Sequence, residues 1–182
     1  MMDQACLKAI LENSKIFENI LQLKKIPRSG WKKKLGIKNP ESVADHAYSV
    51  AAIAMILSDA KRLDTQKILK MALLHDLAES IVGDLTPEDA TKQQKANLEN
   101  TAMKKILSTI NNTQSKQYWK IWIEYQKQSS KEAKLLHDVD KLEMALQAII
   151  YKKSKHNVRP FLDSAKRQIK DNTIRKFIQS LD

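Results

Sequence analysis

The sequence predicts an all-α protein that folds as a single domain. Its 182 residues contain only 3 glycines and 4 prolines, and the segments between them are rich in Leu, Ile, Ala, Lys, Glu and Gln, which favour helices. Within these segments apolar residues recur every three or four positions, whereas no stretch alternates between apolar and polar residues as a strand does. The length suits one hydrophobic core, so we expect one domain over residues 1–182.

The N-terminal part of the chain predicts a helix followed by a loop. Apolar residues follow the helical period over residues 3–24, and Pro27 ends this segment. The next stretch, residues 28–40, contains two glycines and the lysine run 32–34, and is expected to form a loop. Trp31 in this loop is either a hydrophobic plug or the wall of a binding site, and taken alone it favours a plug.

Two central helices follow. Ser42 with Asp45 three residues later is typical of a helix start, with Asp in place of the usual Glu or Gln. His46 then lies one turn into the helix, on the face that carries its apolar residues. A second helix is predicted over residues 64–82, with its cap at residue 64 or 65, and Gly83 suits the left-handed conformation that ends many helices.

Helices also account for the second half of the chain. Thr86 followed by Pro87 and two acidic residues has the composition of a helix start. A helix is predicted at about 93–110, with Leu98, Ala102, Ile106 and Ile110 facing inward. A helix with bulky aromatic residues follows at 115–128, and a long helix begins at 130. The last predicted helix is basic and covers residues 161–181.

The stretch from Met71 to Asp84 carries charge into an otherwise apolar helix. It holds His75, Asp76, Glu79 and Asp84, which are one imidazole and three carboxyl groups within ten residues. Burying such groups together is unfavourable unless a cation lies among them. A His-Asp pair can also be structural, and neighbouring helix positions point about 100° apart, so this stretch alone leaves both interpretations open.

Imidazole nitrogen and carboxylate oxygen are the ligands of divalent metals such as Zn, Mn and Mg. The chain offers His46 on one helix, the pair His75-Asp76 on the next, and an aspartate on a late helix. This pattern resembles the HD-domain superfamily of metal-dependent phosphohydrolases. Over about residues 28–150 the surrounding sequence is most similar to the 5′-deoxynucleotidase branch of that superfamily. The similar segments are Glu41-Ser-Val-Ala-Asp-His46, His75-Asp-Leu-Ala-Glu79, Gly83-Asp84 and Val139-Asp-Lys-Leu-Glu143-Met.

The resemblance implies a helical bundle with a metal site between its central helices. The core would be residues 28–150, with the helices at 3–24 and 161–181 packed on it. In that family pattern His46, His75, Asp76 and Asp140 would hold one divalent ion, which could be Mn, Co, Fe, Zn, Ni or Mg. Family members are commonly homodimers, so a homodimer is expected.

The resemblance also implies a substrate and a reaction, the removal of the 5′-phosphate from deoxyribonucleoside 5′-monophosphates. Glu79 would orient or deprotonate the attacking water, and Asp84 would face the sugar or assist the leaving oxygen. Arg28 would bind the phosphate, where its fork suits two oxygens. Trp31 would press on the ribose and disfavour a 2′-hydroxyl, although Ser29-Gly30 separates it from Arg28, whereas in some relatives the two are neighbours.

The late helix offers a second candidate ligand, because His137-Asp138 repeats the His-Asp pair. Residues two apart on a helix differ by about 200°, so Asp138 and Asp140 cannot both face one ion. The apolar stripe of this helix runs nearer to Asp138. The resemblance aligns Val139-Asp140-Lys-Leu-Glu143 instead, and we follow it in assigning Asp140.

Composition limits the alternatives. The net charge is +11, which favours anionic ligands, but no zinc-finger spacing or aromatic RNA-binding motif makes nucleic acid the expected partner. No apolar run approaches the about 18 residues of a membrane span, and the first twenty residues are too charged for a signal peptide. The single cysteine, Cys6, suits a reducing compartment such as the cytoplasm.

Two rivals to a 5′-deoxynucleotidase remain at this point. One is another HD-domain phosphohydrolase, acting on a phosphodiester or a nucleotide alarmone. The other is a basic helical binding module with a vestigial metal site. Glu79 and Asp84 argue against the binding module, because a degenerate site has little reason to retain uncompensated carboxylates.

Overall fold

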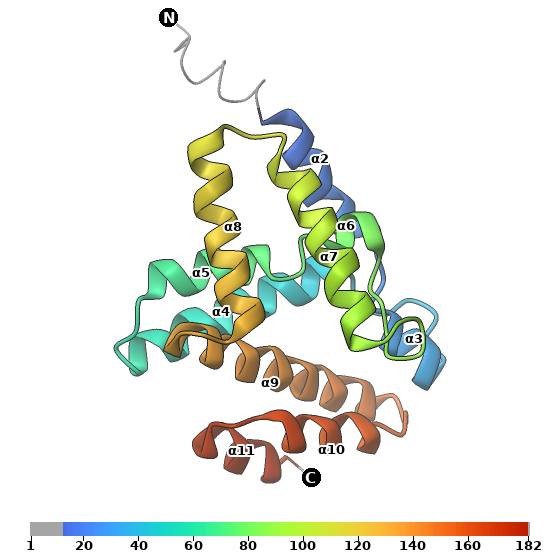
Figure 1. The fold of residues 1–182 in the computed structure, drawn as a ribbon. Coiled ribbons are helices and arrows are strands. Elements are labelled where there is room, and N and C mark those ends of the chain that lie inside the picture. Colours follow the sequence, from blue (N-terminus) through green and yellow to red (C-terminus); the bar gives the residue numbers. More distant parts are fainter. Residues whose placement is uncertain (1–12, 182) are drawn as a thin grey trace, which may run out of the picture.

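Helices make up the regular structure of residues 13–181, the part of the chain that the computed structural model describes (Figure 1). In chain order they are α2 (Ser14–Gln22), the 3-10 helix η1 (Leu23–Lys25), α3 (Ser29–Leu35), α4 (Val43–Ala60), α5 (Thr65–Leu74), α6 (Glu79–Val82), α7 (Lys92–Leu107), α8 (Asn112–Lys127), α9 (Lys131–Lys153), α10 (Arg159–Gln168) and α11 (Asn172–Gln179). Over the same residues the strand-like pairing is limited to an isolated bridge between Pro27 and Ser42. The all-α prediction is confirmed.

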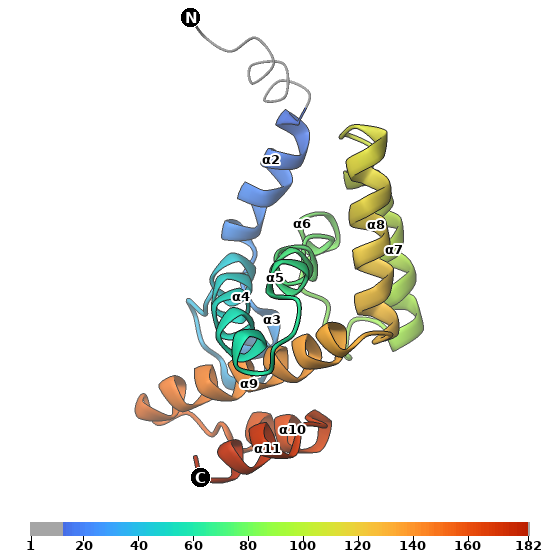
Figure 2. The ribbon, with the colours of Figure 1, turned by 90° about the vertical axis from the view of Figure 1, so that its left-hand side faces the viewer.

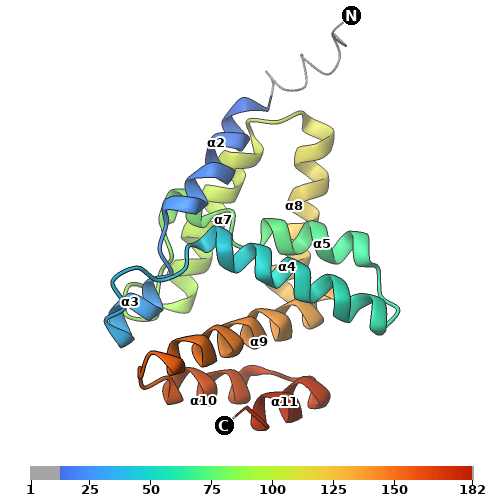
Figure 3. The same ribbon diagram turned by 180° about the vertical axis from the view of Figure 1, so that it is seen from behind.

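The long helix α9 separates two groups of helices. In Figures 1 and 3, α4 and α5 lie across one side of α9, and α10 and α11 lie along its other side. Figure 2 shows α4 and α5 nearly end-on, with α7 and α8 standing side by side next to them. One cluster of buried apolar residues runs through all these layers, from Ile16 in α2 to Ile178 in α11. Among the described helices, none combines the length and hydropathy that crossing a membrane requires.

The N-terminal region differs from the prediction in one respect. The helix expected over 3–24 is present from Ser14 onward, while residues 3–12 lie outside the described part. The expected loop over 28–40 instead contains α3, which ends at Gly36 with φ +66°. The first backbone N–H of α3, from Ser29, donates to Asp84 Oδ2 at 2.6 Å. A carboxylate 55 positions away therefore satisfies the start of α3, and local sequence gives no sign of it.

The two central helices begin as predicted. Ser42 and Asp45 form a reciprocal capping box at the start of α4, and the Asp64 carboxylate accepts from the backbone N–H of Lys67 at the start of α5. The buried face of α4 includes His46 together with Val50. These are the positions that the apolar period predicted.

The helix predicted over 64–82 is interrupted. α5 ends at Leu74, and residues 75–78 form turns that lead into the single turn of α6. The Ala72 carbonyl accepts from His75 Nδ1 at 2.6 Å, and Leu77 and Glu79 donate their N–H groups to the third residue before each of them. The tighter winding replaces the α-helical geometry. Gly83 then ends α6 with a positive φ of 77°.

The predicted helix start at Thr86 is wrong. The Asp89 carboxylate accepts from both the backbone N–H and the hydroxyl of Thr86, so these residues close a turn. The helix begins only at α7, where Thr91 and Gln94 form a capping box. Within α7 the predicted inward residues Ala102 and Ile106 are buried, but Leu98 is 48% exposed and its neighbour Glu99 only 8%. Leu98 was expected to face the core.

The single basic helix predicted over 161–181 is also wrong, because α10 and α11 are separate helices. Between them the backbone N–H groups of Lys170 and Asp171 donate to the two oxygens of Asp138, at 2.8 and 2.9 Å. Asp171 then caps α11 by accepting from the N–H groups of Thr173 and Ile174. The break is thus fixed by a residue on α9.

Candidate metal centre

Two imidazoles and two carboxylates converge where α4, the end of α5 and α9 meet. His46 Nε2 lies 3.4 Å from Asp140 Oδ1 and 3.6 Å from Asp76 Oδ2. His75 Nε2 lies 3.2 Å from the same Asp76 oxygen. The side chains come from three separate segments, and all four are largely buried, with His46 completely inaccessible. The structure therefore brings together the four residues that the resemblance assigned to a metal.

Several of these polar atoms have no hydrogen-bond partner. His46 Nε2, His75 Nε2 and Asp76 Oδ2 are buried without one. Buried polar atoms nearly always have a hydrogen-bond partner in native proteins. Three neighbouring buried atoms without one therefore indicate that a ligand binds among them. His46, His75 and Asp140 offer one ligand atom each, and these atoms lie within 4.8 Å of one another. The donor set of two nitrogens and carboxylate oxygens fits a borderline or hard divalent ion.

The imidazoles are oriented from behind. His46 Nδ1 lies 2.6 Å from Glu143 Oε2, and His75 Nδ1 lies 2.6 Å from the Ala72 carbonyl. Because a carbonyl and a carboxylate accept, each Nδ1 carries a proton, and Nε2 is left as the ring nitrogen that can bind a metal ion. This is the tautomer that metal ligation requires.

The electrostatics of the cluster favour a cation. Burial and the charge of Arg28 act to lower the pKa of His46, yet its contacts with Asp140 and Glu143 raise that pKa to about 9. Burial acts against ionisation of Asp76, but the neighbouring His75 and His46 hold the pKa of that carboxyl well below its usual range. The pKa of Asp140 is lowered in the same way, by Lys141 and His46 against the effect of burial. Such a group of anions binds a proton or a metal ion at the same point.

Glu79 lies beside the cluster and is 2% exposed. Its Oε1 lies 3.3 Å from Lys95 Nζ, while its Oε2 is buried without a partner. Burial, followed by the charges of Asp76 and Asp84, raises the pKa of Glu79 well above its usual range. A carboxyl with a raised pKa can accept and return a proton near neutral pH.

Arg28 and Asp84 form an ion pair next to the candidate ligand Asp76. Arg28 Nη1 lies 3.4 Å from Asp84 Oδ1 and 3.8 Å from Asp76 Oδ2. The carboxylates raise the pKa of Arg28 against the effect of burial, with Asp84 contributing most. The Arg28 Nε is buried and has no partner, so one donor of the guanidinium is available to an anion.

Trp31 has the environment of a core residue. It is 2% exposed, and its Nε1 donates to Glu41 Oε1 at 2.7 Å. Its ring packs on Phe161, with the ring centroids 4.1 Å apart, and meets the edge of Tyr151. The contact with ribose implied by the resemblance has no support in this arrangement, which favours the plug that the sequence alone suggested.

The repeated pair His137-Asp138 has structural contacts. The His137 ring stacks on Tyr125 at 4.2 Å between centroids, and its Nε2 donates to the Tyr125 carbonyl. Asp138 holds the connection between α10 and α11. Over the part of the chain that the structure describes, neither residue has a hydrogen bond or ion pair with the candidate ligands, whereas Asp140 contacts His46.

Sequence reasoning assigned no role to three residues around this site. Lys95 on α7 contacts both Glu79 and Glu99, and Glu143 contacts His46. The spacing of Lys95 and Glu99, four residues apart on one helix, was a usable signal for a pair. Its connection to Glu79 depends on how α7 packs on α6, which the spacing does not give.

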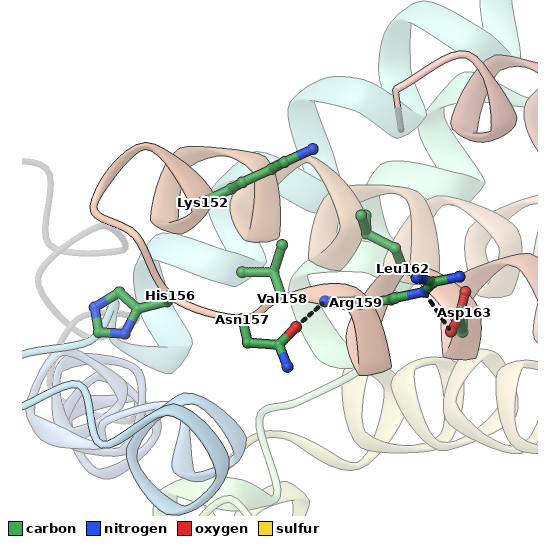
Figure 4. A pocket seen from close by; sticks show the side chains of 7 residues that line it. All are labelled: Lys152, His156, Asn157, Val158, Arg159, Leu162 and Asp163. Carbon is green, nitrogen blue, oxygen red and sulfur yellow. Dashed lines mark hydrogen bonds and ion pairs between the residues drawn. The ribbon is translucent and has the colours of Figure 1, made fainter.

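A surface hollow of about 390 Å³ lies elsewhere, at the connection between α9 and α10 (Figure 4). Its lining residues are Lys152, His156, Asn157, Val158, Arg159, Leu162 and Asp163. None of the predicted site residues is among them. Lys152 and Arg159 are exposed side chains, so this hollow has no buried polar group comparable to those of the metal cluster.

Comparisons with known proteins agree with this geometry. A family model for the HD domain matches residues 20–181. The chain is 43% identical over 145 residues to the 5′-deoxynucleotidase HDDC2 of Dictyostelium discoideum, covering 75% of this chain and 76% of that protein. It is 38% identical over 165 residues to the human 5′-deoxynucleotidase HDDC2, covering 88% and 80%.

Solved structures show the same relationship. The PH0347 protein from Pyrococcus horikoshii OT3 superposes with a TM-score of 0.77 at 35% identity, covering 92% of this chain and 96% of that one. The HD domain-containing protein YGK1 superposes with a TM-score of 0.63 at 29% identity, covering 91% and 80%. The matched residues include every candidate ligand from His46 to Asp140, and the chain belongs to the HD-domain family.

Proposed function

We propose that this protein is a metal-dependent 5′-deoxynucleotidase, which hydrolyses deoxyribonucleoside 5′-monophosphates to deoxynucleoside and phosphate. The observation that carries the proposal is the convergence of three orphaned ligand atoms, from His46, His75 and Asp76, beside the buried carboxyl of Glu79. Relatives that bear the name 5′-deoxynucleotidase are 36–43% identical to this chain over most of its length. They support the substrate class.

His46, His75, Asp76 and Asp140 would hold one divalent ion, whose identity among Mn, Co, Fe, Zn, Ni and Mg the donor set leaves open. When bound, the ion supplies a Lewis acid that polarises the phosphoryl group and makes water acidic. The protein provides the orientation. Glu143 and the Ala72 carbonyl fix the ring positions of the two histidines.

Glu79 is proposed to take the proton of the attacking water. The water oxygen bonds to phosphorus, the bond from phosphorus to the 5′-oxygen breaks, and that oxygen leaves with a proton. Glu79 has the position for this role because its Oε2 has no protein partner. Its raised pKa also allows it to pass the proton on to the leaving oxygen.

Arg28 is proposed to bind a phosphate oxygen through its unpartnered Nε. Asp84 keeps the guanidinium in place and would lie on the sugar side of the phosphate. We assign no sugar contact to Trp31, because its ring is buried among Phe161 and Tyr151.

The test is phosphate release from a panel of deoxy- and ribonucleoside 5′-monophosphates, with each divalent metal and with a chelator. A phosphodiester and a nucleotide alarmone belong in the same panel. We expect release from deoxynucleotides that requires metal. Release only from the diester or the alarmone would support the other class of phosphohydrolase, and metal binding without any release would support a binding module.

We also propose that the protein is a cytoplasmic homodimer. Large apolar side chains are exposed on α2 and α4, namely Phe17, Ile20, Leu21, Tyr48, Met55 and Ile56. Burying such surface against a second copy would be favourable. One cysteine in the whole sequence suits a reducing compartment. Light scattering on the purified protein measures the mass, and a monomer at micromolar concentration would contradict the dimer.

A further inference from the structure

Lys95 on α7 contacts Glu79 from outside the ligand cluster. Its Nζ lies 3.3 Å from Glu79 Oε1, 3.0 Å from the Leu85 carbonyl oxygen and 3.4 Å from Glu99 Oε1. An ammonium has three protons, and here it has three oxygen acceptors within reach. Lys95 therefore has no proton left for a substrate phosphate.

The placement of this ammonium is unfavourable for α7 itself. Lys95 lies in the first turn after the capping residue Thr91, at the positive end of the helix dipole, where a cation is disfavoured. Burial would lower the pKa of Lys95, but the charges of Glu79 and Glu99 raise it. Glu99 is itself buried, at 8% exposed. Apolar residues at positions 95 and 99 would pack without these costs, so the pair indicates a role other than packing.

Glu79 needs an external support. It lies in α6, which has only 4 residues, whereas α7 has 16. A single helical turn is not rigid without tertiary contacts. Lys95 occupies one carboxylate oxygen of Glu79, and the other, Oε2, remains buried without a partner. The ion pair thereby distinguishes the two oxygens and leaves Oε2 as the one without a protein partner.

We propose that Lys95, held in place by Glu99, is a positioning residue that orients the Glu79 carboxylate toward the reacting water. The inference rests on the proposed hydrolysis of deoxynucleotides. It assigns to α7 a role in the reaction, exerted through Glu79 and not through contact with substrate.

A double-mutant cycle tests this coupling. The variants are Lys95→Met, Glu79→Ala and their combination, assayed on deoxyadenosine 5′-monophosphate with Mn²⁺. Misplacing a catalytic group by about 1 Å costs up to roughly a hundredfold in rate, so Lys95→Met should lower kcat roughly tenfold to a hundredfold. KM and the Mn²⁺ affinity measured by calorimetry should stay near the wild-type values. In the Glu79→Ala background the same substitution should cause little further loss, because residues that act as a unit are not additive.

Further variants separate positioning from a structural role. Lys95→Arg keeps the charge and should recover part of kcat, while Lys92→Met, at the exposed first residue of α7, should leave kcat unchanged. If Lys95→Met does not fold, Lys95→Gln takes its place in the cycle. Losses that multiply in the double variant, or a full kcat in Lys95→Met, would overturn the inference. Inactivity of the wild-type protein on every deoxynucleotide would instead overturn the proposed function.

Discussion

Asp138 and Asp140 stand two residues apart on α9, and we predict that their amide variants fail in different ways. Asp138 is 6% exposed, and its carboxylate accepts from the backbone N–H groups of Lys170 and Asp171 at 2.8 and 2.9 Å. In Asp138→Asn one oxygen remains to accept, but the new NH₂ group faces the other N–H. Hydrogen bonds to charged groups contribute about 1.5–3 kcal/mol each. Losing one and weakening the other should lower the free energy of unfolding by about 2–4 kcal/mol.

Thermal unfolding measures this loss. For a chain of this length, each kcal/mol shifts Tm by about 2–4 °C, so Asp138→Asn should lower Tm by roughly 5–15 °C. At a temperature where the variant is folded, its metal-dependent phosphate release should remain close to that of the wild-type protein. Asp140→Asn is the matched control. It should abolish both phosphate release and the rise of Tm on adding Mn²⁺, with a much smaller change of Tm in the absence of metal.

The opposite pattern would refute the reasoning. If Asp138→Asn loses activity at unchanged Tm while Asp140→Asn remains active, Asp138 is the ligand, and the assignment on α9 is displaced by two residues. If both variants have a lower Tm than the wild-type protein and remain active, neither aspartate binds the metal.

Three further predictions concern single residues of the site. Because contacts with carboxylates raise the pKa of His46 to about 9, its proton stabilises the metal-free protein below about pH 6.5, and this stability is lost as the pH rises through 9. Mn²⁺ must displace that proton, so calorimetry in buffers of different ionisation enthalpy should show release of about one proton at neutral pH. Binding of Mn²⁺ without proton release would contradict the raised pKa of His46. Glu79→Ala should keep the Mn²⁺ affinity but lose a factor of about 10² to 10⁴ in kcat; turnover close to wild type would remove Glu79 from the mechanism. Trp31→Ala should cost about 3–5 kcal/mol of stability, measured by urea unfolding, and reduce deoxy- and ribonucleotide hydrolysis equally, whereas a selective gain on ribonucleotides would restore a sugar contact.

The parts of the fold that depend on neighbouring residues could be predicted from the sequence. The capping box of Ser42 and Asp45 needs only residues three apart, and Gly83 ends α6 in a conformation that suits glycine. The start of α3 and the break between α10 and α11 could not be predicted. Each is fixed by a carboxylate distant in sequence, Asp84 for the first and Asp138 for the second.

In the candidate site, too, local features could be predicted from the sequence and contacts between distant residues could not. The types of ligand residue are visible in the sequence, and His46 lies on the predicted inward face. The residues that hold these site residues in place cannot be identified from the sequence. Glu143 contacts His46 across 97 positions, and Lys95 reaches Glu79 only because α7 packs on α6. The apolar period identifies which face of a helix points inward, but not which atom of another helix contacts that face.

The ion pair of Arg28 has a consequence for substrate affinity. Arg28 is held from two sides, by Asp84 and by Asp76, and the turn that carries it is tied to Asp84 through the Ser29 N–H. A flexible side chain that becomes ordered on binding costs about 0.5–1.5 kcal/mol. For Arg28 this entropy is lost when the protein folds, before any phosphate arrives. In the proposed reaction the guanidinium is therefore preorganised, and the phosphate meets a donor whose direction is already set.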